Sequence, residues 1–439
     1  MSDWRQTYMD KLCTAEEAVQ SIKDGKRVLI AGAASRPEHV IRAMIANAKQ
    51  YRNVHVMHGL SSGGEKYCEE KYADNFIYES LFASKSTRKY MNNSNATYVP
   101  CYYYELPHFF RDRVIPVNVF MVQVSTPDKY GYMSTGVNAD FIHQAVKAAD
   151  VVIVQVNNKV PWCASPGCMI HTDEVTHIVE FNEPLPEFPY RPVTDVDRKI
   201  GEYCAELVQN GDTIQIGIGN IPNAICESLM DKKDLGVHSE IISDGVMKLW
   251  KAGVVNNSRK GFDKDTMVGC FAYGSQNLYD LIDKNPAVKL QNSERTNDPR
   301  NVARCTNFIS INTCIEVDLM GQVVSGTSGL RLISGAGGQL DFVRGADMSF
   351  DGKGRSVVAF TSTHEKDGVV TSRIMPHITK GSSVTVPRQD TDYFVTEYGI
   401  ARLKGKNLKD RARELIKIAH PDFRDELIAD FERRYKVKY

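Results

Sequence analysis

The sequence has little that marks a secreted, membrane-spanning or nucleic-acid-binding protein. Its 439 residues contain no run of about eighteen apolar residues, and the opening Met1–Arg5 is not the start of a signal peptide. The 54 basic and 54 acidic residues cancel, so no net charge attracts nucleic acid or an anionic membrane. We therefore expect a soluble, cytoplasmic protein that binds neither nucleic acid nor membranes.

Metal-binding and disulfide patterns are also missing. The ten cysteines are scattered without a C-x-x-C pair, and the closest two are Cys163 and Cys168. In a chain of this length that spacing indicates reduced thiols rather than disulfides or zinc ligands. His55 and His58 lie three apart in a probable strand, where they point to opposite faces. We expect no metal site.

The length allows two domains, and the sequence contains a diverged repeat. Residues 21–44 and 206–229 each have a turn glycine, an apolar strand, a glycine-containing loop, a proline and an amphipathic helix, about 186 residues apart. We predict two open α/β domains with mainly parallel sheets, residues 1–190 and 191–439, joined by a proline-rich linker at 182–198. Chance similarity between two common strand-turn-helix units is the alternative.

Several elements are well signalled. Thr14 and Glu17 form a capping box before an apolar series, and Val119–Val124 and Val151–Val156 are apolar runs typical of strands buried on both faces. The other strands that we predict are 27–31, 307–317, 356–360 and 392–396, and the other helices are 140–150, 408–419 and 424–435.

The stretch from Gly211 to Gly245 is the segment that we predict to hold the functional site. A strand at 213–216 leads into a turn with Gly217 and Gly219, and a helix follows with Pro222 in its first turn. A second strand at about 239–242 carries Glu240. In a parallel sheet, this arrangement brings Glu240 to the edge where α/β sheets bind ligands.

Two chemistries fit this geometry. In a dinucleotide fold the turn binds pyrophosphate, and an acid about twenty residues later binds a ribose hydroxyl. Glu240 follows Gly219 at twenty-one residues, but Pro222 stands where the third glycine is needed. Alternatively, backbone N–H groups of the turn bind an acyl oxygen while Glu240 attacks as a nucleophile. The small residues at 334–339 are a second loop over which a ligand can lie, or simply a turn.

The sequence resembles the acetyl-CoA hydrolase/transferase family, and within it the 4-hydroxybutyrate and butyrate CoA-transferases. The resemblance runs from Thr14 to Phe431. It rests on motifs in the expected order: Gln215–Gly219 with Ile221-Pro222, Gly236–Glu240 with Ser243–Gly245, Asp318–Gln322, Ser334-Gly335, Gly337–Gln339, Asp341–Gly345, Thr396–Ala401 and Ile418–Phe423.

This resemblance implies ping-pong transfer of coenzyme A between carboxylic acids through a glutamyl-CoA thioester. Glu240 matches the family's catalytic glutamate. The family's loop that binds CoA and the oxyanion corresponds here to Gly217, Ile218, Gly219, Asn220 and Ile221. Its second CoA contact corresponds to Gly337 and Gly338. Asn312 matches a polar position near the glutamate, or else it satisfies neighbouring backbone in its strand. We expect Glu397 and Tyr398 to be a buried structural pair.

The chain departs from these relatives at positions that we assign to the acid pocket: Arg36, Arg331 and Ser328. Arginine binds carboxylates with two parallel hydrogen bonds, so the acid is expected to be a dicarboxylate such as succinate or itaconate. Solvated surface arginines are the alternative.

The resemblance also implies the partners: an acyl-CoA, a small carboxylic acid and a second copy of the chain in a homodimer or higher homo-oligomer. No cofactor is expected beyond coenzyme A as co-substrate. An acyl-CoA hydrolase of the same family is an alternative function. A nucleotide-binding dehydrogenase and a non-catalytic CoA-binding protein are alternatives of a different class.

Overall fold

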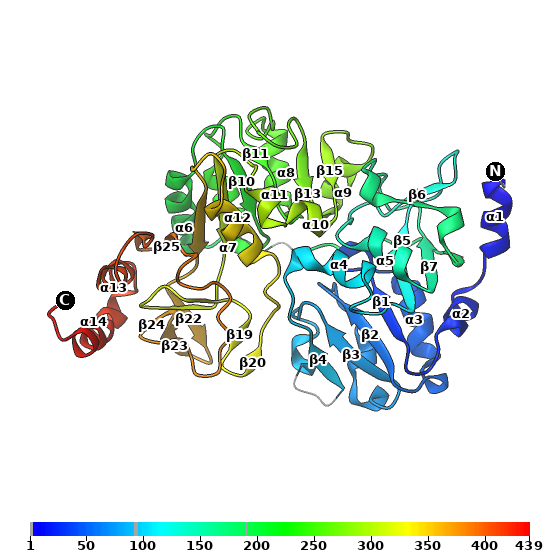
Figure 1. The fold of residues 1–439 in the computed structure, drawn as a ribbon, viewed down its shortest axis with the longest axis horizontal. Helices are drawn as coiled ribbons and strands as arrows, with labels where there is room; N and C mark the ends of the chain where they lie inside the picture. The colour runs from blue at the N-terminus through cyan, green and yellow to red at the C-terminus, as the bar shows by residue number, and fades with distance from the viewer. Residues whose placement is uncertain (1–2, 92–94, 190) are drawn as a thin grey trace. The chain divides into compact units, whose positions relative to one another are not determined.

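The computed structural model describes residues 3–91, 95–189 and 191–439, which form two compact units. Unit 1 is Met1–Pro189 with Val268–Thr296, and unit 2 is Tyr190–Met267 with Asn297–Tyr439 (Figure 1). The sequence-based division placed all of 191–439 in one domain, with a linker whose Tyr190 lies outside the described residues. The structure instead groups residues 268–296 with unit 1.

Backbone hydrogen bonds explain why this later segment belongs to unit 1. The N–H of Ala272 donates to the Val137 carbonyl at 2.8 Å, and the N–H of Ala139 donates to the Cys270 carbonyl at 2.9 Å. An isolated antiparallel bridge therefore pairs 138 with 271. Such long-range pairing leaves no local mark on the sequence.

Unit 1 is built around a parallel sheet. Its helices are α1 (Trp4–Lys11), α2 (Ala15–Ala18), α3 (Glu38–Ala46), α4 (Leu106–Arg111), α5 (Ile142–Ala148), α9 (Gln276–Ile282) and α10 (Ser293–Thr296). Its strands are β1 (Arg27–Ile30), β2 (Val54–His58), β3 (Phe76–Ser80), β4 (Ala96–Tyr98), β5 (Val119–Val124), β6 (Tyr132–Ser134), β7 (Val151–Val156), β8 (Met169–His171), β9 (His177–Glu180), β14 (Phe271–Ala272) and β15 (Val288–Leu290), while β13 (Met267–Gly269) begins at the unit boundary.

Short 3-10 helices connect these elements at Val19–Ser21, Ala33–Ser35, Ala48–Gln50, Lys66–Cys68, Glu70–Tyr72, Arg88–Tyr90, Tyr103–Glu105, Pro166–Cys168 and Thr172–Glu174. The capping box predicted for α2 is confirmed: the Thr14 hydroxyl accepts the N–H of Glu17, and the Glu17 carboxylate accepts the N–H of Thr14.

The sheet of unit 1 has the order β4-β3-β2-β1-β5-β7-β9, and all its pairs are parallel. The predicted strands Val119–Val124 and Val151–Val156 have the bounds expected from their apolar runs, because every residue of β5 is buried and only the first of β7 is partly exposed. Their side chains form the main core with helices α4 and α5.

Unit 2 has a second, mainly parallel sheet. Its helices are α6 (Asp195–Leu207), α7 (Asn220–Ser228), α8 (Asp244–Lys251), α11 (Pro299–Val302), α12 (Gln339–Asp347), α13 (Leu408–Lys417) and α14 (Pro421–Tyr435). Its strands are β10 (Thr213–Ile216), β11 (Gly236–Val237), β12 (Ile241–Ile242), β16 (Phe308–Asn312), β17 (Glu316–Asp318), β18 (Val323–Val324), β19 (Thr327–Ser328), β20 (Arg331–Leu332), β21 (Arg355–Ala359), β22 (Thr363–Lys366), β23 (Val369–Ser372), β24 (Ile374–Met375), β25 (Tyr393–Thr396) and β26 (Gly399–Arg402).

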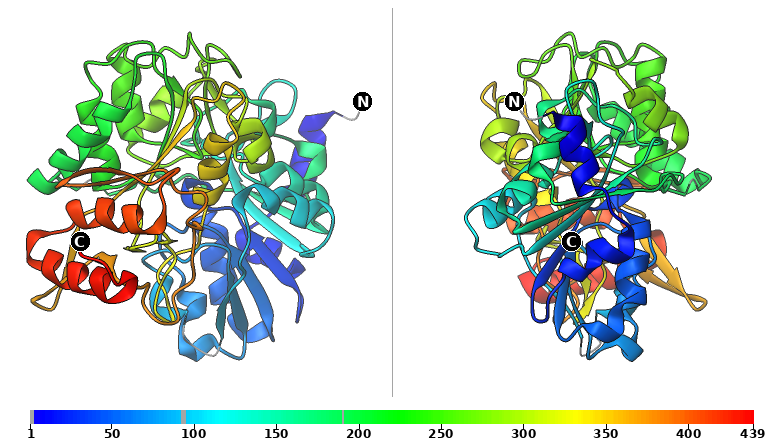
Figure 2. Two further views of the ribbon diagram at one scale, coloured as in Figure 1. Left: turned by 60° about the vertical axis from the view of Figure 1, so that its left-hand side comes forward. Right: turned by 90° about the vertical axis from the view of Figure 1, so that its right-hand side faces the viewer.

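The sheet of unit 2 has the order β11-β10-β16-β21-β25-β26, with only the β25–β26 pair antiparallel. The last two helices, α13 and α14, lie side by side in the left panel of Figure 2 and pack into a core with β25 and β26. We predicted one strand over 307–317, but the chain leaves the sheet after Asn312 and resumes as β17.

The two sheets share one plan, which confirms the predicted repeat of α/β domains. In each, the first strand (β1 or β10) lies inside the sheet, the second strand pairs on one side, and later strands pair on the other. The strand order therefore reverses at β1 and at β10. Ligands of open α/β sheets bind outside the carboxyl ends of the strands at such a reversal.

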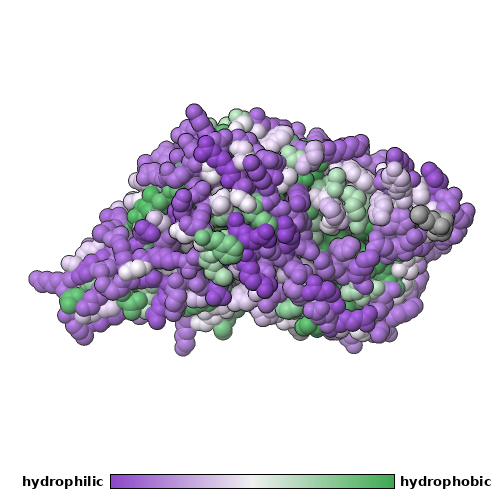
Figure 3. Space-filling model, turned by 45° about the horizontal axis from the view of Figure 1, so that its top comes forward, coloured by the Kyte–Doolittle hydropathy of each residue, from purple (hydrophilic) through white to green (hydrophobic). Residues whose placement is uncertain are grey.

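Surface character adds one observation. The face drawn in Figure 3 is mostly hydrophilic, with apolar residues in small separate patches. Within residues 3–91, 95–189 and 191–439, no helix is both long enough and apolar enough to span a bilayer.

Candidate active site

The candidate site lies at the carboxyl edge of the sheet in unit 2. Strand β10 pairs in parallel with β11 on one side and with β16 on the other, so the three strands end at the same edge. The strand order reverses at β10, which makes this edge the expected ligand site.

The glycine turn after β10 leads directly into helix α7. Gly219 precedes the helix with φ 121° and ψ −173°, a conformation essentially restricted to glycine. No side chain caps the start of α7, so its leading N–H groups can bind an anion. Of the predicted loop residues, Gly217 to Ile221 are all partly exposed, and the Asn220 amide donates to the Pro192 carbonyl at 3.3 Å.

Glu240 lies between two short strands rather than inside one. We predicted a strand over 239–242, but the structure has β11, a bend that contains Glu240, and then β12. The Ser239 hydroxyl donates to the carbonyl of Ile216 at 3.0 Å, which fixes the bend to the end of β10. On the other side, the Lys260 ammonium donates to the Val237 carbonyl at 2.8 Å.

Asn297 contacts the Glu240 carboxylate directly, and the sequence analysis missed it. Its side-chain amide donates to Glu240 Oε2 at 2.8 Å, and Asn297 itself is buried. It is a single asparagine just before α11, in a stretch without periodicity or a motif. Only the folded chain brings it to Glu240, 57 residues away.

Gly338 lies against the same carboxylate. A Cβ added at this position would lie 2.2 Å from Glu240 Oε2 and 2.1 Å from Asn297 Nδ2, so only glycine fits without movement. Gly337 before it has φ +56°, and Gly338 precedes helix α12 without a side-chain cap. The positive end of this helix favours negative charge nearby. The predicted loop after 335 is thus short, because residues 339–347 are helical.

Asn312 ends β16 and bonds to its neighbours in the sheet. Its amide donates to Gln215 Oε1 at 3.1 Å and to the Ser310 hydroxyl at 2.9 Å, and the Gln215 amide donates back at 3.3 Å. The Gln339 amide donates to the carbonyl of the next residue, Thr313, at 3.2 Å. The strand that we predicted over 307–317 therefore ends at Asn312, and the bond from Gln339 links the next residue to α12.

The predicted acid-pocket residues lie in two places. Ser328 and Arg331 face each other in the β19–β20 hairpin, where both are exposed and the intervening Leu330 is 90% exposed. Arg36 belongs to unit 1 and is fully buried.

Glu397 and Tyr398 do not form the buried pair that we expected. Glu397 accepts the N–H of Ser362 at 2.9 Å and its hydroxyl at 2.6 Å, so it links the ends of β21 and β25. Tyr398 is 36% exposed and contacts the His420 ring.

These groups match what acyl transfer through a covalent intermediate requires. A carboxylate oriented by an amide can attack an acyl carbonyl as a nucleophile. Two uncapped helix starts at the same edge supply N–H groups where negative charge develops on an acyl oxygen. Gly338 has no side chain, so its backbone can lie directly against the carboxylate.

Comparison with known proteins agrees with this assignment. The family model of the acetyl-CoA hydrolase/transferase N-terminal domain matches residues 1–188, and that of the C-terminal domain matches residues 274–431. The 4-hydroxybutyrate coenzyme A transferase of Clostridium kluyveri is 43% identical over 99% of this chain and 100% of that protein. The succinyl-CoA:cyclohexane-1-carboxylate CoA transferase of Geobacter metallireducens is 38% identical over 99% of this chain and 98% of that protein.

Solved structures give the same result. RipA from Yersinia pestis superposes with a TM-score of 0.93 at 34% identity, over 99% of this chain and 100% of that one. A 4-hydroxybutyrate CoA-transferase from Porphyromonas gingivalis superposes with a TM-score of 0.83 at 35% identity, over 99% of this chain and 100% of that one. Two matching family models and full-length relatives at this identity lead to one assignment: the chain belongs to the acetyl-CoA hydrolase/transferase family, and its full-length relatives are CoA-transferases.

Proposed function

We propose that this enzyme transfers coenzyme A from a short-chain acyl-CoA to a free carboxylic acid through a thioester on Glu240. The observation that carries the proposal is the Glu240 carboxylate itself, bonded by Asn297 at 2.8 Å and lying against the backbone of Gly338. The curated relatives at 35–43% identity over nearly the whole chain are named as CoA-transferases, some of them for 4-hydroxybutyrate, butyrate or succinyl-CoA.

The proposed reaction has two halves. A Glu240 oxygen attacks the acyl-CoA carbonyl, the C–S bond breaks, and an acyl-glutamyl anhydride and CoA thiolate result. The thiolate attacks the glutamyl carbonyl, which forms the glutamyl-CoA thioester and releases the first acid as its carboxylate. An acceptor carboxylate then reverses these steps. No metal or redox group takes part.

The residues at the carboxyl edge have matching roles in this scheme. The N–H groups at the starts of α7 and α12 bind CoA or stabilise the oxyanion, an effect of about 3 kcal/mol for each donor in other acyl-transfer enzymes. Asn297 orients the carboxylate. Asn312 fixes Gln215 beside the turn rather than bonding to Glu240.

The acid is a short-chain monocarboxylate or a dicarboxylate such as succinate or itaconate. Homo-oligomer formation is also part of the proposal, for which the resemblance is the support. A cytoplasmic location is supported by the ten cysteines, which are thiols and mostly buried.

Intact mass spectrometry tests the covalent step. The protein is mixed with butyryl-CoA, with and without acetate, and the mass is read before and after hydroxylamine. We expect an adduct of one coenzyme A on Glu240, and none in Glu240→Gln. Hydroxylamine should release this adduct as free CoA and leave a hydroxamate on Glu240. Glu397→Gln is the matched control, because it changes another carboxylate at the same sheet edge. An adduct that persists in Glu240→Gln would refute the proposal.

Hydrolysis is the competing reaction, because the family also includes acetyl-CoA hydrolases, two of which are 32% identical over about half of this chain. The two functions differ in what attacks the thioester. Release of free CoA without any acceptor acid, at the rate of acid-dependent transfer, would identify a hydrolase. The dehydrogenase alternative requires binding of a nicotinamide dinucleotide, which calorimetry measures directly.

A further inference from the structure

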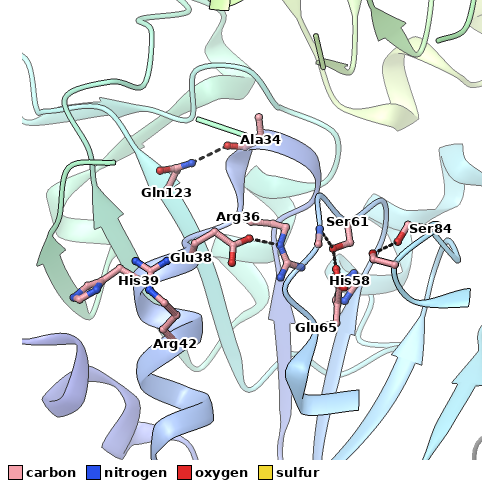
Figure 4. A network of polar contacts seen from close by, with 12 residues as sticks. Ala34, Arg36, Glu38, His39, Arg42, His58, Ser61, Glu65, Ser84 and Gln123 are labelled. Carbon is pink, nitrogen blue, oxygen red and sulfur yellow. Dashed lines mark hydrogen bonds and ion pairs between the residues drawn. The ribbon is translucent and has the colours of Figure 1, made fainter. Parts of the chain in front are cut away.

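Arg36 is a buried cation at the carboxyl edge of the other sheet, in unit 1. It lies in the loop between β1 and α3, and its side chain is 0% exposed. Its Nε donates to Glu38 Oε1 at 2.8 Å (Figure 4). Within the part of the chain that the structure describes, Nη1 and Nη2 have no hydrogen-bond partner.

The groups around Arg36 are otherwise engaged. Figure 4 shows Arg36 between Glu38 on one side and Ser61, His58 and Glu65 on the other. The Glu65 carboxylate accepts the Ser61 hydroxyl. The Tyr67 hydroxyl and His58 Nε2 are 2.7 Å apart, and His58 Nδ1 lies 2.9 Å from the Gly59 carbonyl.

Of the titratable side chains beside Arg36, His58 and Tyr67 are uncharged, so its charged neighbours are Glu38 and Glu65. Burial and, second, the Arg36 cation lower the pKa of His58 to about 3. Burial raises the pKa of Tyr67 well above its ordinary value. Near neutral pH both rings are therefore uncharged. One cation faces Glu38 and Glu65, and only Glu38 bonds to it.

A buried guanidinium edge without acceptors is unfavourable unless a ligand completes it. Buried polar groups in proteins nearly always have a partner, and an unpaired charged donor is the most unfavourable case. The two Nη atoms form a planar fork that matches the two oxygens of a carboxylate.

The position of Arg36 points to a ligand as well. The strand order of unit 1 reverses at β1, and Arg36 lies in the loop that follows this strand. Ala33, earlier in the loop, has φ +49°, which is unusual for a residue other than glycine and is a form of strain common at ligand sites.

A glycine-rich segment, residues 59–64, covers the loop that holds Arg36. The Leu60 carbonyl accepts the N–H of Ala33 at 2.7 Å, and a Cβ on Gly64 would lie 3.4 Å from Glu38 Oε2. Gly63 and Gly64 have φ +126° and +83°. The segment thus lies against residues before and after Arg36 in the chain. Its two glycines adopt backbone conformations that other residues rarely reach.

We propose that the Nη1–Nη2 edge of Arg36 binds the carboxylate of a small organic acid. The acid is either a substrate with a second carboxylate or a separate effector acid. Only the first identification rests on the proposed function. Glu65 competes for the same cation, so it weakens binding.

Binding is measured by calorimetry on the full chain with Glu240→Gln, so that turnover plays no part. The ligands are succinate and succinamide, its uncharged diamide, which has no carboxylate. We expect succinate to bind at least about tenfold more tightly, and Arg36→Gln to remove this preference. Arg42→Gln, at an exposed arginine of α3 paired with Glu183, is the matched control. Equal binding of succinate before and after Arg36→Gln would overturn the proposal.

Glu65→Gln gives a second, opposite test that does not depend on the folding of the arginine variant. Removing the competing charge is expected to tighten succinate binding severalfold, with succinamide unaffected. If Glu65→Gln leaves succinate binding unchanged or weaker, Arg36 serves to neutralise the two glutamates and the proposal is wrong.

Turnover distinguishes the two sources of the carboxylate. The ratio of kcat/KM for succinate to that for butyrate is compared between the wild type and Arg36→Gln. A fall of about tenfold or more identifies the ligand as the acid substrate. An unchanged ratio together with lost binding identifies an effector acid. Failure of the Glu240 thioester would leave the binding result intact.

Discussion

The carboxyl edges of the two sheets have the same topology and opposite chemistry. In unit 2, the turn after the second strand presents the Glu240 carboxylate, with an amide donor and a bare glycine beside it. In unit 1, the corresponding turn after β2 is glycine-rich and covers the cation of Arg36. The strands preserve the plan, and the loops carry the difference.

The difference teaches how each edge is prepared for a ligand. Beside Glu240 there is no space for a side chain at position 338, because even a methyl group on Gly338 would collide with the carboxylate. Beside Arg36, by contrast, two glutamate side chains lie near one guanidinium. At one edge a carboxylate lies against bare backbone, and at the other a buried guanidinium donates from Nε to Glu38.

The largest effect is expected from Gly338→Ala. Its Cβ would displace the Glu240 carboxylate or the Asn297 amide. Displacement of a reacting group by about 1 Å lowers rates about a hundredfold, so we expect kcat to fall by at least that factor while the fold is retained. Gly217→Ala is the comparison, because its Cβ would meet no atom within 4 Å, and we expect a much smaller loss. Wild-type kcat in Gly338→Ala would contradict the described contact.

A smaller loss is expected from Asn297→Ala. It removes the donor to Glu240 Oε2, so the carboxylate is oriented less firmly. We expect kcat to fall about tenfold to a hundredfold. Asn312→Ala removes bonds to Gln215 and Ser310 only, so its effect should be smaller. Steady-state kinetics with butyryl-CoA and acetate rank the two, and the reverse order would place Asn312 at the reacting atoms.

The smallest effect concerns stability and unit 1. Burial lowers the pKa of His58 to about 3, from 6.5 in the unfolded chain. The unfolded chain therefore takes up the proton first, so the stabilising contribution is full above about pH 6.5 and is lost as the pH falls toward 3. The loss reaches about 1.4 kcal/mol for each pH unit.

Urea unfolding at pH 7, 6 and 5 measures this slope, and His58→Gln should flatten it. The variant keeps polar atoms near the Tyr67 hydroxyl and the Gly59 carbonyl but does not titrate. If the unfolding free energy fell equally with pH in the two proteins, His58 would not cause the loss of stability at acid pH.

Much of this fold is predictable from the sequence because its signals are local. Apolar runs such as Val119–Val124 mark buried strands, and Thr14 with Glu17 marks a helix start. The glycine turn before α7 and Glu240 follow from the order of elements and from the family motifs. The last helix begins at Pro421, three residues before the predicted start, because His420 caps it.

The remaining features depend on tertiary contacts. Asn297 has no sequence signature, since its partner is 57 residues away. The strand ends at Asn312, and the next residue, Thr313, accepts a hydrogen bond from α12, a contact that the local sequence does not signal. Arg36 and Arg331 look alike in the sequence, yet one is fully buried and the other lies on an exposed hairpin. Burial of a single polar residue is decided by the chain that packs over it.

The grouping of Val268–Thr296 with Met1–Pro189 has a consequence for synthesis on the ribosome. A nascent chain emerges at about 5–20 residues per second, and amino-terminal domains usually fold first. Here the first unit still lacks a segment when its leading 189 residues have emerged, and it is completed only after residue 296. The intervening residues 190–267 must wait unfolded or form part of the second unit early. A truncation at the apparent domain boundary therefore yields an incomplete fold.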